Sequence, residues 1–273
     1  MRTRRSVLET SNPALRNQDS WHTGIAVGGD GTATLQGVVN KTGMLSTIAV
    51  IGGMLGIWLT QNYPSLLLPS GILGFISIIV VYFMIMRNPA NAKGVAWLYA
   101  LVQGAFLGVL TNLLDGLLAS MEVVATGGLA LQAFVITVSV LLAMLALYYF
   151  KILQPTKMFK SVVGVLTLGI FLTYVISFVM SLFGAHMPFL SISSAMEGGQ
   201  SAYIGLGLNV LILGVASLWL IIDFGMIEEQ LKSDAPKHME WFSAFILMVT
   251  LIWIYLEAIK LCFRLALLFG KRD

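Results

Sequence analysis

Long apolar stretches separated by short polar segments run through most of the chain. Crossing a hydrocarbon core of roughly 30 Å takes about 20 mostly apolar residues, and unbroken windows near this length recur along the sequence. Such windows indicate helices, because the strands of membrane barrels are short and alternate in polarity. The pattern predicts seven membrane-spanning helices, over about residues 44–61, 66–86, 94–119, 129–150, 161–183, 203–225 and 241–269.

The segment before the first window is polar and contains several glycines between residues 24 and 31. It lacks the apolar core of a secretory signal peptide, and the pair Arg4-Arg5 has no apolar region behind it. We therefore predict a flexible cytoplasmic arm over residues 1–41 and a seven-helix domain over residues 42–273. A binding module is the alternative interpretation of the arm.

The composition supports a membrane protein. Charged residues make up 11% of the chain and apolar residues 58%, whereas an ordinary soluble domain is about 25% charged. This composition disfavours a soluble enzyme, a nucleic-acid binder and a disordered chain. The single cysteine, Cys262, excludes an internal disulfide and a cysteine-based metal cluster.

Basic residues occur in alternate polar segments, and the first, third and fifth loops have none. The positive-inside rule then places the arm and the even-numbered loops in the cytoplasm, and seven crossings place the C-terminus outside. Lys271 and Arg272 break the rule: either this cluster is tolerated or the last segment does not cross fully, and we favour full crossing. The cytoplasmic basic residues are Arg2, Arg4, Arg5, Arg16, Lys41, Arg87, Lys93, Lys151, Lys157, Lys160, Lys232 and Lys237.

Two small-residue motifs indicate where helices approach closely. Gly52-x-x-x-Gly56 lies in the first window and Gly104-x-x-x-Gly108 in the third, and such pairs let neighbouring backbones come together. We interpret both as packing motifs. The absence of an internal repeat gives no support to an inverted-repeat transporter.

Ionisable side chains within a bilayer are costly and are functional candidates by default. Asp115 lies near the outer end of the third window, Asp223 near the inner end of the sixth, and Glu257 well inside the seventh. The neutral polar residues Gln103, Asn112 and Asn209 accompany them.

Glu257 belongs to a row of polar residues with Ser243, Thr250 and Arg264, each seven positions from the next. Seven positions are two helical turns, so the row shares one face, with Lys260 on the same side. We predict that this face points into the protein or a wet cavity. The alternative is that Glu257 pairs with Lys260 or Arg264 along its own helix.

Two carboxyl groups close together in a dry interior would share a proton. This chemistry suits a pH-dependent gate or a cation path at Asp223 and Glu257. It does not suit a tight metal cage, since calcium takes six to eight oxygen ligands, so a cation would bind weakly there and pass on.

Acidic residues also follow the sixth window, at Glu228, Glu229, Asp234 and Glu240. They could concentrate cations at the inner mouth of a path. The alternative is that they keep the loop solvated, together with Lys232 and Lys237.

The same inventory argues against an enzyme. Neither Asp223 nor Glu257 lies in the Gly-x-Gly-Asp motif of intramembrane aspartyl proteases. The histidines His22, His186 and His238 all fall outside the spans, and no phosphate-binding loop or metal-binding histidine pair occurs. We therefore expect neither catalysis nor a cofactor.

The order of these features resembles the bacterial branch of the Bax inhibitor-1 family over about residues 34–268. The matching motifs are the Asp in the sixth span, Tyr255-Leu256-Glu257 in the seventh, Asn40-Lys41-Thr42-Gly43, Gln154-Pro155-Thr156-Lys157-Met158-Phe159-Lys160, and the run from Asp223 through Glu240-Trp241 to Leu261.

The resemblance implies a bundle in which six helices surround a central seventh, located in the bacterial inner membrane. It also implies a pH-sensitive calcium leak governed by two acidic residues, which match Asp223 and Glu257, with Arg87 as a basic neighbour. Some bacterial members bind and restrain a membrane-bound AAA protease, so a protease-modulating interaction protein is the alternative function.

The chain departs from the family pattern in three places. Leu73-Gly74-Phe75 stands where some members have an acidic residue, Glu257 replaces the commoner Asp, and 34 positions separate Asp223 from Glu257. If the turn between the last two helices lies near residues 234–236, the two carboxyls differ in depth by roughly 15 Å. Spacing therefore predicts separate depths, whereas the resemblance predicts a pair.

Overall fold

The computed structural model describes residues 31–123, 127–185 and 198–270, together with residues 187, 190, 192, 195 and 196. Seven helices in these ranges are long and apolar enough to cross a membrane, so the predicted spans are confirmed and the chain is an all-α, multi-pass membrane protein. They are α3 (Leu35–Asn62), α4 (Leu67–Arg87), α5 (Ala92–Ser120), α6 (Leu129–Tyr149), α7 (Lys157–Leu182), α9 (Gly199–Lys232) and α10 (Met239–Phe269), with short 3₁₀ turns η1 (Pro64–Leu66) and η2 (Pro89–Asn91).

Helix α3 begins nine residues before the first predicted window. Thr34 caps it, because its side chain accepts a hydrogen bond from the backbone N–H of Gly37. Residues 35–41, predicted above as part of the arm, are therefore the first two turns of α3. Residues 1–30 and the tail residues Lys271 and Arg272 lie outside the described residues.

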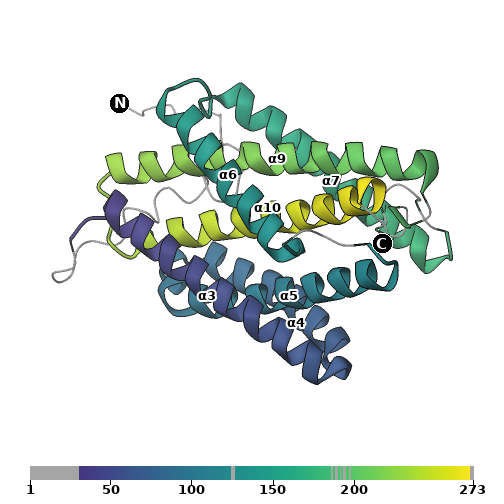
Figure 1. The fold of residues 1–273 in the computed structure, drawn as a ribbon. Helices are drawn as coiled ribbons and strands as arrows, with labels where there is room; N and C mark the ends of the chain where they lie inside the picture. The colour runs from purple at the N-terminus through teal and green to yellow at the C-terminus, as the bar shows by residue number, and fades with distance from the viewer. Residues whose placement is uncertain are drawn as a thin grey trace.

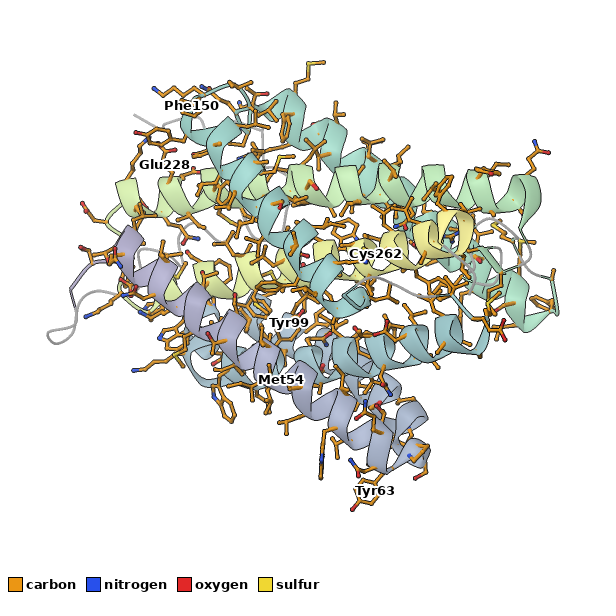
Figure 2. The ribbon with its side chains drawn as sticks, in the orientation of Figure 1. Met54, Tyr63, Tyr99, Phe150, Glu228 and Cys262 are labelled. Atoms are coloured by element: carbon orange, nitrogen blue, oxygen red, sulfur yellow. The ribbon has the colours of Figure 1, made fainter. Side chains whose placement is uncertain are left out.

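Helix α10 lies at the centre of the bundle and has the largest buried share of the seven helices. Its main contacts are with α3, α5, α6 and α9, and it runs between α9 and the pair α3 and α5 (Figure 1). Helix α4 packs on α5, and α7 packs on α9. Side chains of α10 such as Phe245, Ile254 and Phe263 are fully buried. Cys262 on α10 is buried too, whereas Glu228 lies at the periphery (Figure 2).

The two glycine motifs pack against each other. A Cβ atom at Gly52 or Gly56 of α3 would overlap the backbone of α5, and one at Gly104 or Gly108 of α5 would overlap the backbone of α3. The predicted packing role of both motifs is therefore confirmed, and the structure adds that each motif is the partner of the other.

The chain before α3 is joined to the turn between α9 and α10. The backbone N–H of Ala33 donates to the carbonyl of Ala235 at 2.8 Å. Glu240 at the start of α10 accepts hydrogen bonds from the N–H and hydroxyl of Thr34, at 2.9 and 3.0 Å, and forms an ion pair with Lys41. The start of α3 and the α9–α10 turn thus form one end of the bundle, which we call the hairpin end.

Candidate functional site

Asp223 lies on α9 where that helix faces α10, and its residue is 2% exposed. The hydroxyl of Thr250 on α10 donates a hydrogen bond to its Oδ2 at 2.6 Å. Across the described ranges, Asp223 takes part in no ion pair. We call Asp223 and Thr250 the Asp223 level.

Glu257 is buried on α10, 1% exposed, and it contacts two groups. The amide Nδ2 of Asn209 on α9 donates to its Oε2 at 2.8 Å and to its backbone carbonyl at 3.2 Å. Lys260 forms an ion pair with Oε1 at 2.5 Å. Both interpretations of Glu257 therefore apply, because its face points into the protein and it also pairs along its own helix. We call Glu257, Asn209 and Lys260 the Glu257 level.

The structure does not bring the two candidate carboxyls into one cluster. Thr250, the partner of Asp223, precedes Glu257 by seven residues, which is about 10 Å along a helix. Each carboxyl has its own partners, and none is shared between them. The separate depths that spacing predicts are therefore found, and the close pair that the resemblance implies is not formed in this structure.

A regular register explains why polar groups meet between α9 and α10. Ser243 donates to the side-chain oxygen of Gln230 at 2.6 Å, and Thr250 donates to Asp223 in the same way one step further along. From the first pair to the second, the residue number rises by seven on α10 and falls by seven on α9. Continuing the register sets the small, fully buried Ala216 opposite Glu257. Glu257 bonds to Asn209 instead, the residue seven positions beyond Ala216.

From the sequence, Asn209 is a neutral polar residue of the sixth span, and Glu240 is one of four acidic residues that either concentrate cations at an inner mouth or keep the loop solvated. Asn209 could have been found from the spacings of 209, 223 and 230, which are fourteen and seven residues and so follow the seven-residue period of the row on α10. Glu240 is 1% exposed and binds the start of α3, so it fastens the hairpin end rather than lining a mouth. No local signal reveals this role, since Thr34 lies 206 residues away.

The remaining basic candidates differ in their surroundings. Arg264 is buried, 3% exposed, and interacts electrostatically with Glu257 and with Tyr174 of α7. Arg87 is exposed at the end of α4, and within the described residues it forms no ion pair with Asp223 or Glu257. The basic partner of Glu257 is thus on α10 itself.

Among the acidic candidates outside the two levels, Glu228 and Asp115 have structural partners. Glu228 pairs with Lys232 at 2.5 Å, with both side chains well exposed, and accepts a hydrogen bond from Tyr148. Glu229 is exposed beside it. Asp115 accepts the backbone N–H of Leu129 at 3.2 Å, which stabilises the start of α6.

Oxygen ligands for a cation exist at both levels, but in small number. Among the described residues, no three His, Cys, Asp or Glu side chains gather as a metal site. A cation at Asp223 would meet one carboxylate and one hydroxyl, and a cation at Glu257 would first have to displace an ammonium group. Such incomplete coordination is suited to weak, transient binding.

Comparison with known proteins agrees with this architecture. A family model described as Bax inhibitor 1 like matches residues 6–266, nearly the whole chain. No curated protein matches the sequence. The chain therefore belongs to the Bax inhibitor-1 family of multi-pass membrane proteins.

Proposed function

We propose that this protein is a pH-sensitive cation leak, with calcium as the transported ion, controlled by its intramembrane carboxyl groups. Family membership supports the proposal, and one observation carries it: Asp223 is a buried carboxyl between two transmembrane helices and has a hydroxyl rather than a counter-charge as its partner. Such a group in a bilayer is costly and is therefore a functional candidate by default.

The interface between α9 and α10 supplies the route in this proposal. Starting from the hairpin end, polar side chains occur at Gln230 and Ser243, then at the Asp223 level, then at the Glu257 level. A protonated Asp223 is neutral and favours a closed, hydrogen-bonded seam. An ionised Asp223 adds a negative charge that attracts cations, so the flux rises with pH.

Reconstitution into liposomes loaded with a calcium-sensitive dye tests the proposal. The wild-type protein is expected to admit calcium at a rate that depends on pH, and Asp223→Asn and Glu257→Gln are expected to change that rate. Asp115→Asn is the matched control, because Asp115 is a carboxyl on α5 that binds the start of α6. No calcium flux at any pH, or flux unchanged by both substitutions, contradicts the proposal.

We also propose that the hairpin end faces the cytoplasm of a bacterial inner membrane. Basic residues of the α6–α7 loop and the α9–α10 turn support this orientation through the positive-inside rule. A cysteine introduced at Lys237 is expected to resist a membrane-impermeant thiol reagent in intact cells and to react after lysis. Labelling of that cysteine in intact cells contradicts the orientation.

A further inference from the structure

Lys260 joins two helices at the Glu257 level. Its ammonium group contacts Oε1 of Glu257 at 2.5 Å and the hydroxyl of Tyr174 on α7 at 3.2 Å. It also lies 5.6 Å from the centre of the Tyr174 ring, within the range of a cation–π interaction. The lysine therefore has two acceptors, one inside the bundle and one on a peripheral helix.

The charges at this level disfavour a passing cation. Glu257 contributes one negative charge, while Lys260 and the buried Arg264 contribute two positive charges close to it. Like charges repel strongly where water is scarce. The ammonium group also occupies one oxygen of the carboxylate that a cation would use. With Lys260 in place, the Glu257 level repels calcium.

Lysine is suited to being displaced from this position. Its charge is a compact ammonium group on a flexible four-carbon stem, unlike the rigid planar fork of arginine. Movement away from Glu257 toward Tyr174 would need only side-chain rotation, and the hydroxyl and ring of Tyr174 would still stabilise the charge. The carboxylate of Glu257 would retain the amide of Asn209.

We infer that Lys260 is a tethered cation that occupies the Glu257 carboxylate and limits calcium passage, with Tyr174 as the group that receives it when the ion passes. This role rests on the proposed cation leak and adds the residue that sets its resistance. Glu257 then has two alternative partners, the lysine and the permeating cation, which compete for the same oxygen.

Calcium flux into liposomes tests the role with substitutions at Lys260, Glu257 and Tyr174. Lys260→Gln is expected to raise the initial rate about tenfold, because the ammonium group that the Glu257 carboxylate attracts no longer competes with calcium for its oxygen. Lys260→Arg keeps the charge and is expected to stay near or below the wild-type rate. In a Glu257→Gln background, Lys260→Gln is expected to add nothing, since the carboxylate for which the two cations compete is gone. Tyr174→Phe, which removes the hydroxyl and keeps the ring, is expected to lower the rate.

Calcium-dependent thermal stabilisation of the purified protein supplies a measurement that does not require flux. A ligand that binds the folded state raises its unfolding temperature, so Lys260→Gln is expected to show a larger calcium-induced shift than the wild type. A flux and a calcium shift both equal to those of the wild type overturn the role of Lys260, even where Asp223→Asn still alters flux. A wild type without any flux contradicts the proposed leak, and the calcium shift then decides the competition at Glu257 separately.

Discussion

The Asp223 level and the Glu257 level lie on the same two helices, yet their carboxyl groups have opposite surroundings. Asp223 has a hydroxyl partner and, within the described residues, no counter-ion. Glu257 has a lysine in contact, an arginine nearby and an amide from α9. Two residues account for the difference, because Ala216 at the register position opposite Glu257 offers no polar group and Lys260 brings a positive charge. Local partners, rather than burial alone, therefore determine what each carboxyl can do.

A third buried carboxyl provides a reference for the comparison. Glu240 is as deeply buried as Glu257 but fastens the hairpin end through Lys41 and Thr34. Removing one member of a buried ion pair leaves an uncompensated charge, so Lys41→Met is expected to lower the free energy of unfolding by about 3–5 kcal/mol. Lys232→Met, which breaks an exposed pair, is expected to cost less than about 1 kcal/mol. Chemical unfolding in detergent measures both. Equal effects of the two variants contradict a structural role for Glu240.

Loss of the hydrogen bond from Asn209 of α9 to Glu257 is expected to have the next largest effect on the free energy of unfolding. Asn209→Ala removes the amide that donates to the Glu257 carboxylate, and a hydrogen bond to a charged group within a membrane contributes about 1–2 kcal/mol. The same unfolding measurement compares it with Asn112→Ala, whose partners are both neutral, the hydroxyl of Thr60 and the amide of Gln61. A smaller loss for Asn209→Ala than for Asn112→Ala contradicts the importance of the contact between α9 and Glu257.

The pH dependence of calcium flux distinguishes the role of Asp223 from that of Glu257. Asp223→Asn removes the carboxyl without a counter-ion and is expected to abolish the pH dependence of calcium flux. Glu257→Gln is expected to change the rate by about tenfold while the pH dependence remains, because a neighbouring charge alters the field along the route. Rates measured across a pH series check this. If Glu257→Gln abolishes the pH dependence and Asp223→Asn does not, Glu257 rather than Asp223 is the carboxyl that senses pH.

The smallest expected effect on the free energy of unfolding comes from removing the hydroxyl of Thr250, which donates to Asp223. Thr250→Val keeps the shape of the side chain and removes the donor to Asp223, with an expected loss of about 0.5–1.5 kcal/mol. Thr250→Ser keeps a hydroxyl and is expected to lose less. A Thr250→Val protein as stable as the wild type shows that the hydrogen bond contributes nothing to the fold.

The spans and the separate depths of the carboxyls could be predicted from the sequence, because both depend on local apolar length and helical rise. The early start of α3 could not be obtained from apolar windows, since Gln36, Asn40 and Lys41 make this stretch polar. Thr34 is of a residue type favoured at N-caps, but the start of the helix is also held by Glu240, which is remote in sequence.

Partners across helices were the least predictable feature. Each glycine motif could be recognised, but their mutual contact depends on how α3 and α5 cross. Asn209 is the partner of Glu257 only because of the register between α9 and α10, in which Ala216 provides no polar group. The exposed position of Arg87 likewise depends on where α4 ends.

A double-mutant cycle between Asp223→Asn and Glu257→Gln tests the central claim, that the two carboxyls act at separate levels. Free energies of unfolding are measured for the wild type, both single variants and the double variant under one condition. Sites without shared partners and more than about 7–10 Å apart are additive within roughly 0.5 kcal/mol, which is the predicted result. A coupling energy above about 1 kcal/mol would show that the two carboxyls form one proton-sharing site and would contradict the claim.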